Sequence, residues 1–242
     1  MGEAERANWS LTLLGSWALR RDDVLVDVAW RQRRLIAALA VLGSRSRHYL
    51  DGLLWPDSSM TQASGSLRAA VWRVRHELPL VLAPVHDPLA LDPEVRTDLQ
   101  ELHTTVAALH DGEAAAASSA DIELLRTAEL LPGWYEEWVL LEQDHLRLLR
   151  LSALERVAEC LLRQGDIARA LHAALAATTI APLHESAQRL LLRSYLASDN
   201  QADAVTAYLA FRAGLRRELG LEPSANLTAL VWPDHAWPDP AR

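Results

Sequence analysis

The stretch that decides the fold is Leu50–Leu78, LDGLLWPDSSMTQASGSLRAAVWRVRHEL. Leu50–Trp55 is a short apolar segment, Pro56–Ser59 has the composition of a turn, and Thr61–Leu78 has helical spacing. The longer segment repeats apolar residues along one side, namely Ala63, Leu67, Ala70, Val71, Val74 and Leu78. Two helices joined by a tight turn, the second with a single apolar stripe, predict a helix-turn-helix.

The remaining sides of the second helix carry side chains that suit DNA. They are polar, basic or aromatic: Ser64, Ser66, Arg68, Trp72, Arg73, Arg75 and His76. Such side chains bind phosphates and base edges, and the two serines lie near the helix terminus that approaches phosphate. We expect these residues to form a DNA-binding surface, with Arg45 and Arg47 lining the phosphate path. For a single arginine, solvation or an internal ion pair is the competing interpretation. For Trp72, stacking on a sugar, contact with a thymine methyl group and packing against the sheet all remain open.

The charge distribution supports this location. The net charge is −8, all 24 basic residues are arginine, and residues 99–242 hold 12 arginines against 20 acidic residues. Residues 31–76, by contrast, hold eight arginines and only two acidic residues, so the basic patch coincides with the helix-turn-helix. Within this patch, Arg31, Arg33 and Arg34 are expected to divide between solvent and pairing with nearby aspartates.

The flanking segments complete a winged helix over residues 1–97. Residues 1–30 contain short alternating segments and predict a small antiparallel sheet. Residues 31–42 have helical spacing and end at a glycine, which predicts a supporting helix. After residue 79, LVLAPV and LALD flank His86-Asp87-Pro88, the pattern of a hairpin.

Residues 98–230 predict a separate all-α domain. Helical segments are divided at glycine, proline and asparagine breaks, and two of them correspond, with Ala170 and Ala204 a tetratricopeptide-like 34 residues apart. Residues 231–242 are rich in proline and predict a flexible tail unless Trp232 or Trp237 packs on a neighbouring surface. The overall expectation is a mainly α protein with a small β component.

The segment PGWYEEWVLL places Trp134, Tyr135 and Trp138 within about one and a half helical turns. Aromatic residues so spaced form either a binding hot spot or part of a core, and we expect core. The predicted apolar face continues through Leu141, Leu146, Leu149, Leu154 and Val157. Glu136, Glu137 and Glu142 are expected to face water.

Several classes of function are not indicated. No apolar run is long enough to span a bilayer and the first residues do not resemble a signal peptide, which predicts a soluble, cytoplasmic protein. The single cysteine, Cys160, is expected to be a small buried hydrophobe. There is no P-loop, HExxH or GxSxG motif, and His103 and His110 lack thiolate or carboxylate partners, so we expect surface histidines, no catalytic residues, no metal and no cofactor.

The chain resembles the SARP-type transcriptional activators of actinobacteria, which join a winged helix to a bacterial transcriptional activator domain. The resemblance covers about residues 9–230. It rests on RQRRLIAALAVL, LLWPD and SLRAAVWRVRHEL in the first half. In the second half it rests on LLPGWYEEWVLLEQDHLRLLRLSALERVAECLLRQGD and AYLAFRAGLRRELGLEPS.

The resemblance implies sequence-specific binding to double-stranded promoter DNA, often at direct repeats, with recruitment of RNA polymerase and control of secondary-metabolism genes. A homodimer is compatible with it. Two features depart from the family: the wing APVHDPLALD has no arginine, and Trp72 stands where a small polar residue is common. The competing hypothesis is therefore an adaptor or ligand-binding regulator whose winged helix has lost strong DNA binding.

Overall fold

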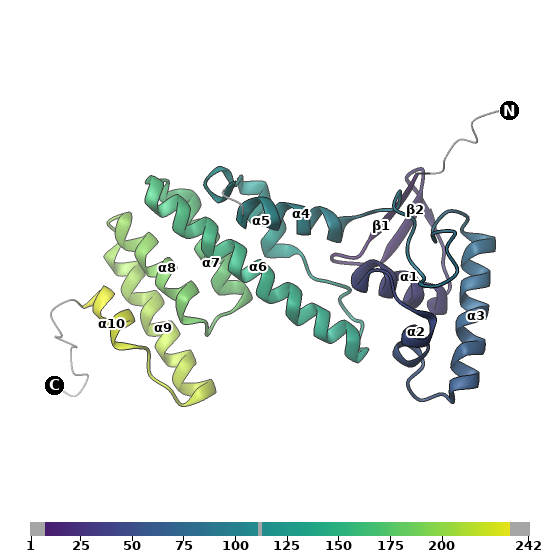
Figure 1. The fold of residues 1–242 in the computed structure, drawn as a ribbon. Helices are drawn as coiled ribbons and strands as arrows, with labels where there is room; N and C mark the ends of the chain where they lie inside the picture. Colours follow the sequence, from purple (N-terminus) through teal and green to yellow (C-terminus); the bar gives the residue numbers. More distant parts are fainter. Residues whose placement is uncertain (1–7, 111–112, 233–242) are drawn as a thin grey trace. The chain divides into compact units, whose positions relative to one another are not determined.

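The computed structural model describes residues 8–110 and 113–232. They form two compact units (Figure 1). The N-terminal unit comprises the chain up to residue 101 together with residues 129–144, and the helical unit comprises residues 102–128 and those from 145 onward. The chain therefore leaves the N-terminal unit and returns to it, whereas the sequence predicted a single boundary at residues 97 and 98. The reason is backbone pairing of the returning segment, in which Leu131 N donates to Leu13 O at 2.8 Å.

A four-stranded sheet opens the N-terminal unit. Its strands are β1 (Trp9–Thr12), β2 (Ala18–Arg21), β3 (Val24–Val26) and β4 (Arg96–Thr97), in the order β3-β2-β1-β4. The first three are antiparallel, as predicted, and β4 adds a parallel pair with β1 that the sequence did not indicate. The tight turn between β2 and β3 places Asp22 and Asp23 at positive φ, the geometry that a two-residue hairpin requires.

The helix-turn-helix consists of α1 (Trp30–Leu42), α2 (Arg47–Leu54) and α3 (Met60–Glu77). α2 begins three residues earlier than predicted because Ser46 caps it, accepting a hydrogen bond from Tyr49 N. α3 begins with a capping box between Ser59 and Gln62. The predicted stripe of α3 is buried, as are the facing leucines of α1 and α2. The indole of Trp9 in β1 donates to Pro79 O at 2.9 Å and so ties the sheet to the end of α3.

The wing is a loop rather than the predicted two-stranded hairpin. Leu82 and Leu91 form one isolated antiparallel bridge, flanked by a hydrogen bond of 3.1 Å from Ala83 N to Ala90 O. Pro84 and Pro88 have no backbone N–H, so strand pairing cannot continue toward the tip. A second bridge joins Leu89 to Arg45 just before α2.

Residues 129–144, which return to the N-terminal unit, include the first two turns of α6 (Glu137–Gln164). Trp134 and Trp138 are buried, as predicted, and the ring of Trp134 packs against that of Trp30 in a tilted arrangement, with centroids 4.5 Å apart and planes inclined by 49°. Tyr135 is 82% exposed and Leu141 is 55% exposed, so the prediction of core was wrong for these two residues. Tyr135 lies in the irregular turn before α6, which begins only at Glu137, and Leu141 lies within α6 on its exposed side.

The helical unit contains α4 (Asp98–His110, shared with the N-terminal unit), the 3-10 helix η1 (Glu113–Ala116), α5 (Ser119–Thr127) and the later part of α6. It continues with α7 (Ile167–Ile180), α8 (Glu185–Ala197), α9 (Gln201–Leu219) and α10 (Ala225–Val231). α7 packs on α8, and α9 packs on α8 and α10. Ala170 and Ala204, the residues that suggested a 34-residue repeat, are both fully buried. The predicted combination of a winged helix and a tetratricopeptide-like domain is confirmed.

Three arginines secure the helix ends of this unit. The buried Arg150 donates to Leu125 O at 2.5 Å and to Arg126 O at 2.6 Å, which satisfies carbonyls at the end of α5. Arg156 donates to Leu109 O at 3.1 Å and Arg169 donates to Ala117 O at 2.9 Å. These three arginines, of the twelve in residues 99–242, therefore donate at least one hydrogen bond to a backbone carbonyl within the unit.

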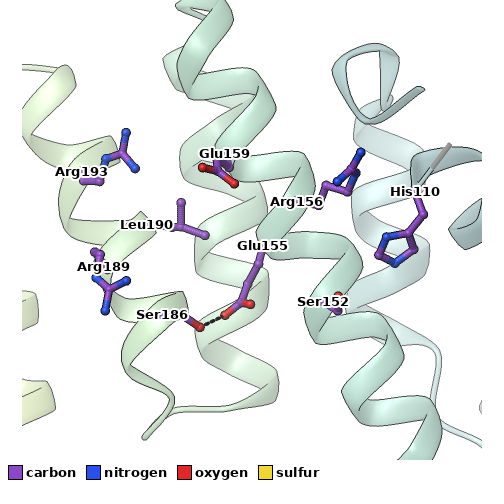
Figure 2. Close-up of a pocket in the computed structure, with 9 residues that line it drawn as sticks. All are labelled: His110, Ser152, Glu155, Arg156, Glu159, Ser186, Arg189, Leu190 and Arg193. Atoms are coloured by element: carbon purple, nitrogen blue, oxygen red, sulfur yellow. Dashed lines mark hydrogen bonds between the residues drawn. The ribbon is translucent and has the colours of Figure 1, made fainter. Parts of the chain in front are cut away.

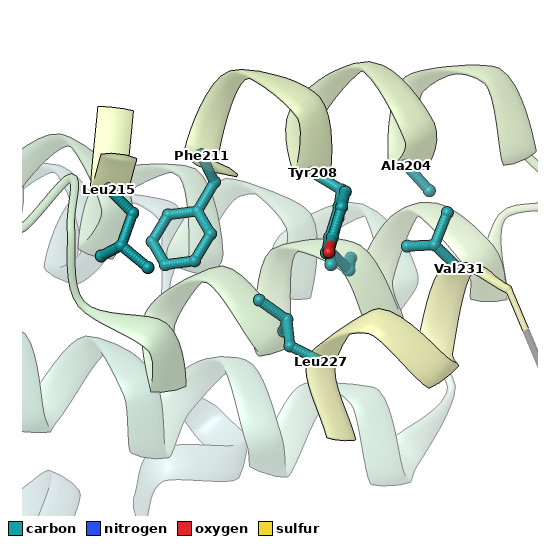
Figure 3. Packing of buried hydrophobic residues seen from close by; sticks show 7 residues of the cluster. Ala204, Tyr208, Phe211, Leu215, Leu227 and Val231 are labelled. Carbon is teal, nitrogen blue, oxygen red and sulfur yellow. The ribbon is translucent and has the colours of Figure 1, made fainter. Parts of the chain in front are cut away.

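The last repeat is closed by an apolar cluster. It consists of Leu192, Ala204, Tyr208, Phe211, Leu215, Leu227 and Val231 (Figure 3). Trp232 packs edge-on against Tyr208, with ring centroids 5.0 Å apart, so one of the two tryptophans considered in the tail packs on the unit. Trp237 and the rest of the predicted flexible tail, residues 233–242, lie outside the described residues.

Candidate nucleic-acid interface

The two sides of α3 differ in burial. The buried stripe centres on Leu67 and Val74, and the opposite side is exposed at Arg68, Trp72, Arg73 and His76. Because residues three or four positions apart lie on the same face of a helix, Arg68, Trp72 and His76 form one outward row, and Arg73 flanks it. The sequence predicted this partition, and the structure brings these four side chains to one surface.

Trp72 and His76 form a flat aromatic surface on the outward row. Their rings are stacked, with centroids 5.1 Å apart and planes inclined by 11°. The Trp72 side chain is 63% exposed, which removes the interpretation that it packs against the sheet. Contact with a sugar or a thymine methyl group remains open to it.

Arg68 and Arg73 are the available cations of α3. Within residues 8–110 and 113–232, neither side chain makes a hydrogen bond or an ion pair, in contrast to Arg75. Gly65 lies one turn before Arg68 and Ala69, and a Cβ added to it would meet only the Arg68 guanidinium, at 4.0 Å. A glycine inside a helix costs roughly 0.5–1 kcal/mol relative to alanine and allows another backbone to approach closely. The sequence analysis missed Gly65, although an isolated glycine in a helical pattern was a usable signal.

Arg75 and Arg47 hold the wing in place. Arg75 Nη2 donates to Val85 O at 2.8 Å and to Ala83 O at 3.3 Å. Arg47 Nε donates to His86 O at 2.9 Å from the other side of the loop. Both residues were predicted to contact DNA, and the structure gives them a positioning role within the protein. They also place two guanidinium groups beside a wing that has no arginine of its own.

The remaining residues predicted to contact DNA are Ser64, Ser66 and Arg45, and two of them make contacts within the protein. The Ser64 hydroxyl donates to the buried carboxylate of Asp51 at 2.5 Å and so ties α2 to α3. Ser66 is half-buried. Arg45 donates to Ser44 O at 2.9 Å and its guanidinium lies 5.6 Å from the ring centroid of Tyr49, an exposed residue that the sequence analysis did not single out.

The arginines of α1 behave largely as expected. Arg31 is exposed, and Arg33 pairs with Asp27 at 3.1 Å. Arg34 pairs with Glu136 at 2.8 Å, a partner from the returning segment rather than from the nearby aspartates. That ion pair is formed by Glu136, which was expected to face water, because residues 129–144 fold back onto α1.

A second candidate site is a groove of about 320 Å³ in the helical unit (Figure 2). It lies along α6 and α8 and is lined by His110, Ser152, Glu155, Arg156, Glu159, Ser186, Arg189, Leu190 and Arg193. The groove contains side chains of both charges and no arrangement typical of a catalytic centre. Among the described residues, no group of three histidine, cysteine, aspartate or glutamate side chains is placed to hold a metal ion. His103 is exposed, as expected, and Cys160 is partly buried beside Arg163.

Comparison with known families gives one match over most of the helical part. The model described as "Bacterial transcriptional activator domain" matches residues 91–231. In the part of the chain that the structure describes, no helix has the length and apolar character of a membrane span.

Two curated relatives are similar along most of this chain. The regulatory protein AfsR of Streptomyces coelicolor is 29% identical over 224 residues, which cover 88% of this chain and 23% of that protein. The AfsR protein of Streptomyces griseus is 28% identical over 212 residues, covering 85% of this chain and 19% of that protein. The chain therefore spans about a quarter or less of the length of these relatives.

Among solved structures, Mycobacterium tuberculosis EmbR in complex with a low-affinity phosphopeptide has a similar fold. The TM-score is 0.73 at 24% identity, and the match covers 93% of this chain and 64% of that one. The resemblance to SARP-type regulators drawn from the sequence is confirmed by these comparisons together.

Proposed function

Because this chain belongs to the bacterial transcriptional activator domain family, whose members are transcriptional regulators and not enzymes, we propose that it binds promoter DNA sequence-specifically through α3. The observation that carries the proposal is the exposed side of α3. Arg68, Trp72, Arg73 and His76 lie there without the internal contacts that occupy Arg75 and Arg47. In a major groove, such a row offers guanidinium donors to guanine or phosphate and an aromatic surface to base edges.

The wing contributes by position rather than by its own charge. Its loop is held between Arg75 of α3 and Arg47 of α2, so its tip keeps a fixed place relative to the reading helix. The guanidinium nitrogens that do not donate to loop carbonyls are available to nearby phosphates. The arginine-free wing is thereby compensated by arginines from the helix-turn-helix.

The helical unit completes the proposed regulator. Its residues carry most of the acidic excess of the chain, which disfavours contact with DNA and favours contact with protein. We assign to it contacts with RNA polymerase or with a second copy of the chain on adjacent direct repeats, with activation as the outcome. Genes of secondary metabolism are the target class suggested by the family resemblance.

The test is selection of duplexes from a random pool with the full chain, followed by affinity measurements at several salt concentrations. A sequence-selective complex below micromolar concentration is expected, with an affinity that falls as salt rises. Arg68→Ala should weaken it, whereas Arg217→Ala should not, because Arg217 lies in the helical unit paired with Glu218. Equal affinity for selected and random duplexes would favour the competing function, a helical adaptor or ligand-binding regulator without strong DNA binding.

A further inference from the structure

The α6–α8 groove concentrates cations in the acidic half of the chain. Residues 99–242 hold 12 arginines and 20 acidic residues, yet Arg156, Arg189 and Arg193 line this single groove together with His110. Such a reversal of local charge marks a place where an anion is favoured. We propose that the groove binds the phosphate or carboxylate group of a small molecule.

The two acidic side chains of the groove, Glu155 and Glu159, do not neutralise its three arginines. Glu155 is already engaged, because it accepts a hydrogen bond from the Ser186 hydroxyl (Figure 2). It accepts another from His184 Nδ1 at 3.2 Å. Both donors lie at the start of α8, so Glu155 fastens that helix to α6. Glu159 is the other acidic lining residue, so the groove is lined by two carboxylates and three guanidinium groups.

The arginines of α8 have the spacing of a clamp. Arg189 and Arg193 are four residues apart, so they extend from the same side of the helix (Figure 2). Arg189 forms an ion pair of 3.6 Å with Glu185, one turn earlier in α8. Within residues 8–110 and 113–232, Arg193 makes no hydrogen bond or ion pair. Their planar forks can each bind an oxyanion with two N–H groups.

Arg156 of α6 is oriented by a hydrogen bond on the other side of the groove. Its Nε donates to Leu109 O at 3.1 Å, which orients the guanidinium and leaves the two terminal nitrogens for other acceptors. Leu190, only 8% exposed, supplies an apolar contact in the groove. The volume of about 320 Å³ lies at the lower end of the range for small-molecule sites, so a metabolite-sized anion fits better than a helix.

The repeat provides an independent reason to regard the arginines as specific to this groove. Positions 34 residues apart correspond in the two repeats, and Glu155 and Glu159 of α6 thereby correspond to Arg189 and Arg193 of α8. The shared small residue, Ser152 or Ser186, is unchanged. Charge is thus reversed at two equivalent surface positions while the helical scaffold is kept, which stacking of the repeats does not require.

The experiment uses the full chain and two probes, inorganic phosphate and citrate, with sodium chloride at matched ionic strength as the control. Heats of binding are measured by titration calorimetry, and thermal unfolding is followed in parallel because a bound ligand stabilises the folded state. One or both probes should bind and raise the melting temperature above the chloride control, and the preferred probe distinguishes phosphate from carboxylate ligands.

Arg193→Gln should weaken binding of the preferred probe at least about tenfold, which is roughly 1.4 kcal/mol. This variant is expected to fold, because Arg193 is exposed. Arg217→Gln, the matched control in the same unit, should bind as the unaltered chain does. Binding no stronger than that of chloride, or binding equal in Arg193→Gln and Arg217→Gln, would overturn the proposal. DNA binding is measured separately, so failure here leaves the proposed function of α3 intact.

Discussion

Arg73 and Arg75 are two residues apart on α3, and we predict that their removal has different consequences. Arg75 donates to Ala83 O and Val85 O in the wing, whereas Arg73 is exposed on the proposed reading side. Arg75→Met keeps the aliphatic stem and removes the donors. Arg73→Ala removes the guanidinium without uncovering any carbonyl of the wing.

The expected magnitudes follow from these contacts. A hydrogen bond from a charged group contributes about 1.5–3 kcal/mol when buried, but Val85 is exposed and its carbonyl can bind water after the change. For the two bonds together we expect Arg75→Met to lower the free energy of unfolding by about 1–3 kcal/mol. Arg73→Ala should change it by less than about 0.5 kcal/mol, as exposed substitutions usually do.

For DNA binding, the substitution of Arg73 is expected to have the direct effect. If Arg73 contacts a base with two hydrogen bonds, Arg73→Ala should weaken specific binding by about 1–3 kcal/mol, or roughly 5- to 150-fold, and relax selectivity at one position. If Arg73 contacts a phosphate, affinity should fall for all duplexes and the slope of log K against log salt should decrease by about 0.9.

The measurements are urea unfolding followed by circular dichroism and fluorescence anisotropy with a selected and a random duplex. Unfolding curves separate the two variants on stability, and the anisotropy titrations at fixed salt separate base from phosphate contact. The assignment of Arg73 fails if both duplexes bind Arg73→Ala as they bind the unaltered chain. The assignment of Arg75 as a brace of the wing fails if Arg75→Met unfolds at the same urea concentration as the unaltered chain.

Three further predictions test other parts of the molecule. Gly65→Ala should stabilise α3 by about 0.5–1 kcal/mol in urea unfolding, yet weaken specific binding if DNA approaches the helix backbone there; unchanged anisotropy titrations would exclude that close approach. Arg150→Met should lower the free energy of unfolding by roughly 2–5 kcal/mol because buried carbonyls of α5 lose a charged donor, and a loss below about 1 kcal/mol would contradict the capping role. A hydrogen bond from Arg169 lowers the pKa of Asp166 below its ordinary value, so the stability that this carboxylate contributes is present above that value and is lost as the pH falls through the lowered pKa. Asp166→Asn keeps an N-cap acceptor and should flatten the decline in melting temperature below about pH 5, and an unchanged decline would assign the pH dependence to other groups.

Burial also sets an opposite pH response in the N-terminal unit. Asp98 accepts backbone hydrogen bonds from Leu13 at 2.9 Å and Leu14 at 3.0 Å, but burial outweighs them and raises its pKa. A raised folded-state pKa means that this group favours the folded state below its ordinary value and loses that contribution as the pH rises. The acid response of the two units is therefore expected to differ in sign at these two aspartates.

Helical periodicity in the sequence was sufficient to locate the buried and exposed sides of α3. The apolar stripe through Leu67 and Val74 was predicted from local spacing, and so was the exposure of Arg68 and Trp72. The same method failed at Tyr135, which lies in a turn before α6, and at Leu141, which lies within α6 but on its exposed side. It also predicted a two-stranded hairpin for the wing, where the structure has a loop. The prolines of that segment lack N–H groups and so interrupt strand pairing.

The sequence by itself determined which side chains are exposed on α3, because burial along a helix follows a local 3.6-residue period. Only the tertiary structure decided which arginines remain available. Arg75, Arg47 and Arg34 are engaged by the wing loop or by residues 129–144, partners that lie from eight to about a hundred positions away in the chain. Arg68 and Arg73 keep their charge free on the surface. The physical reason is that a hydrogen-bond partner brought close by folding has no counterpart in local residue spacing.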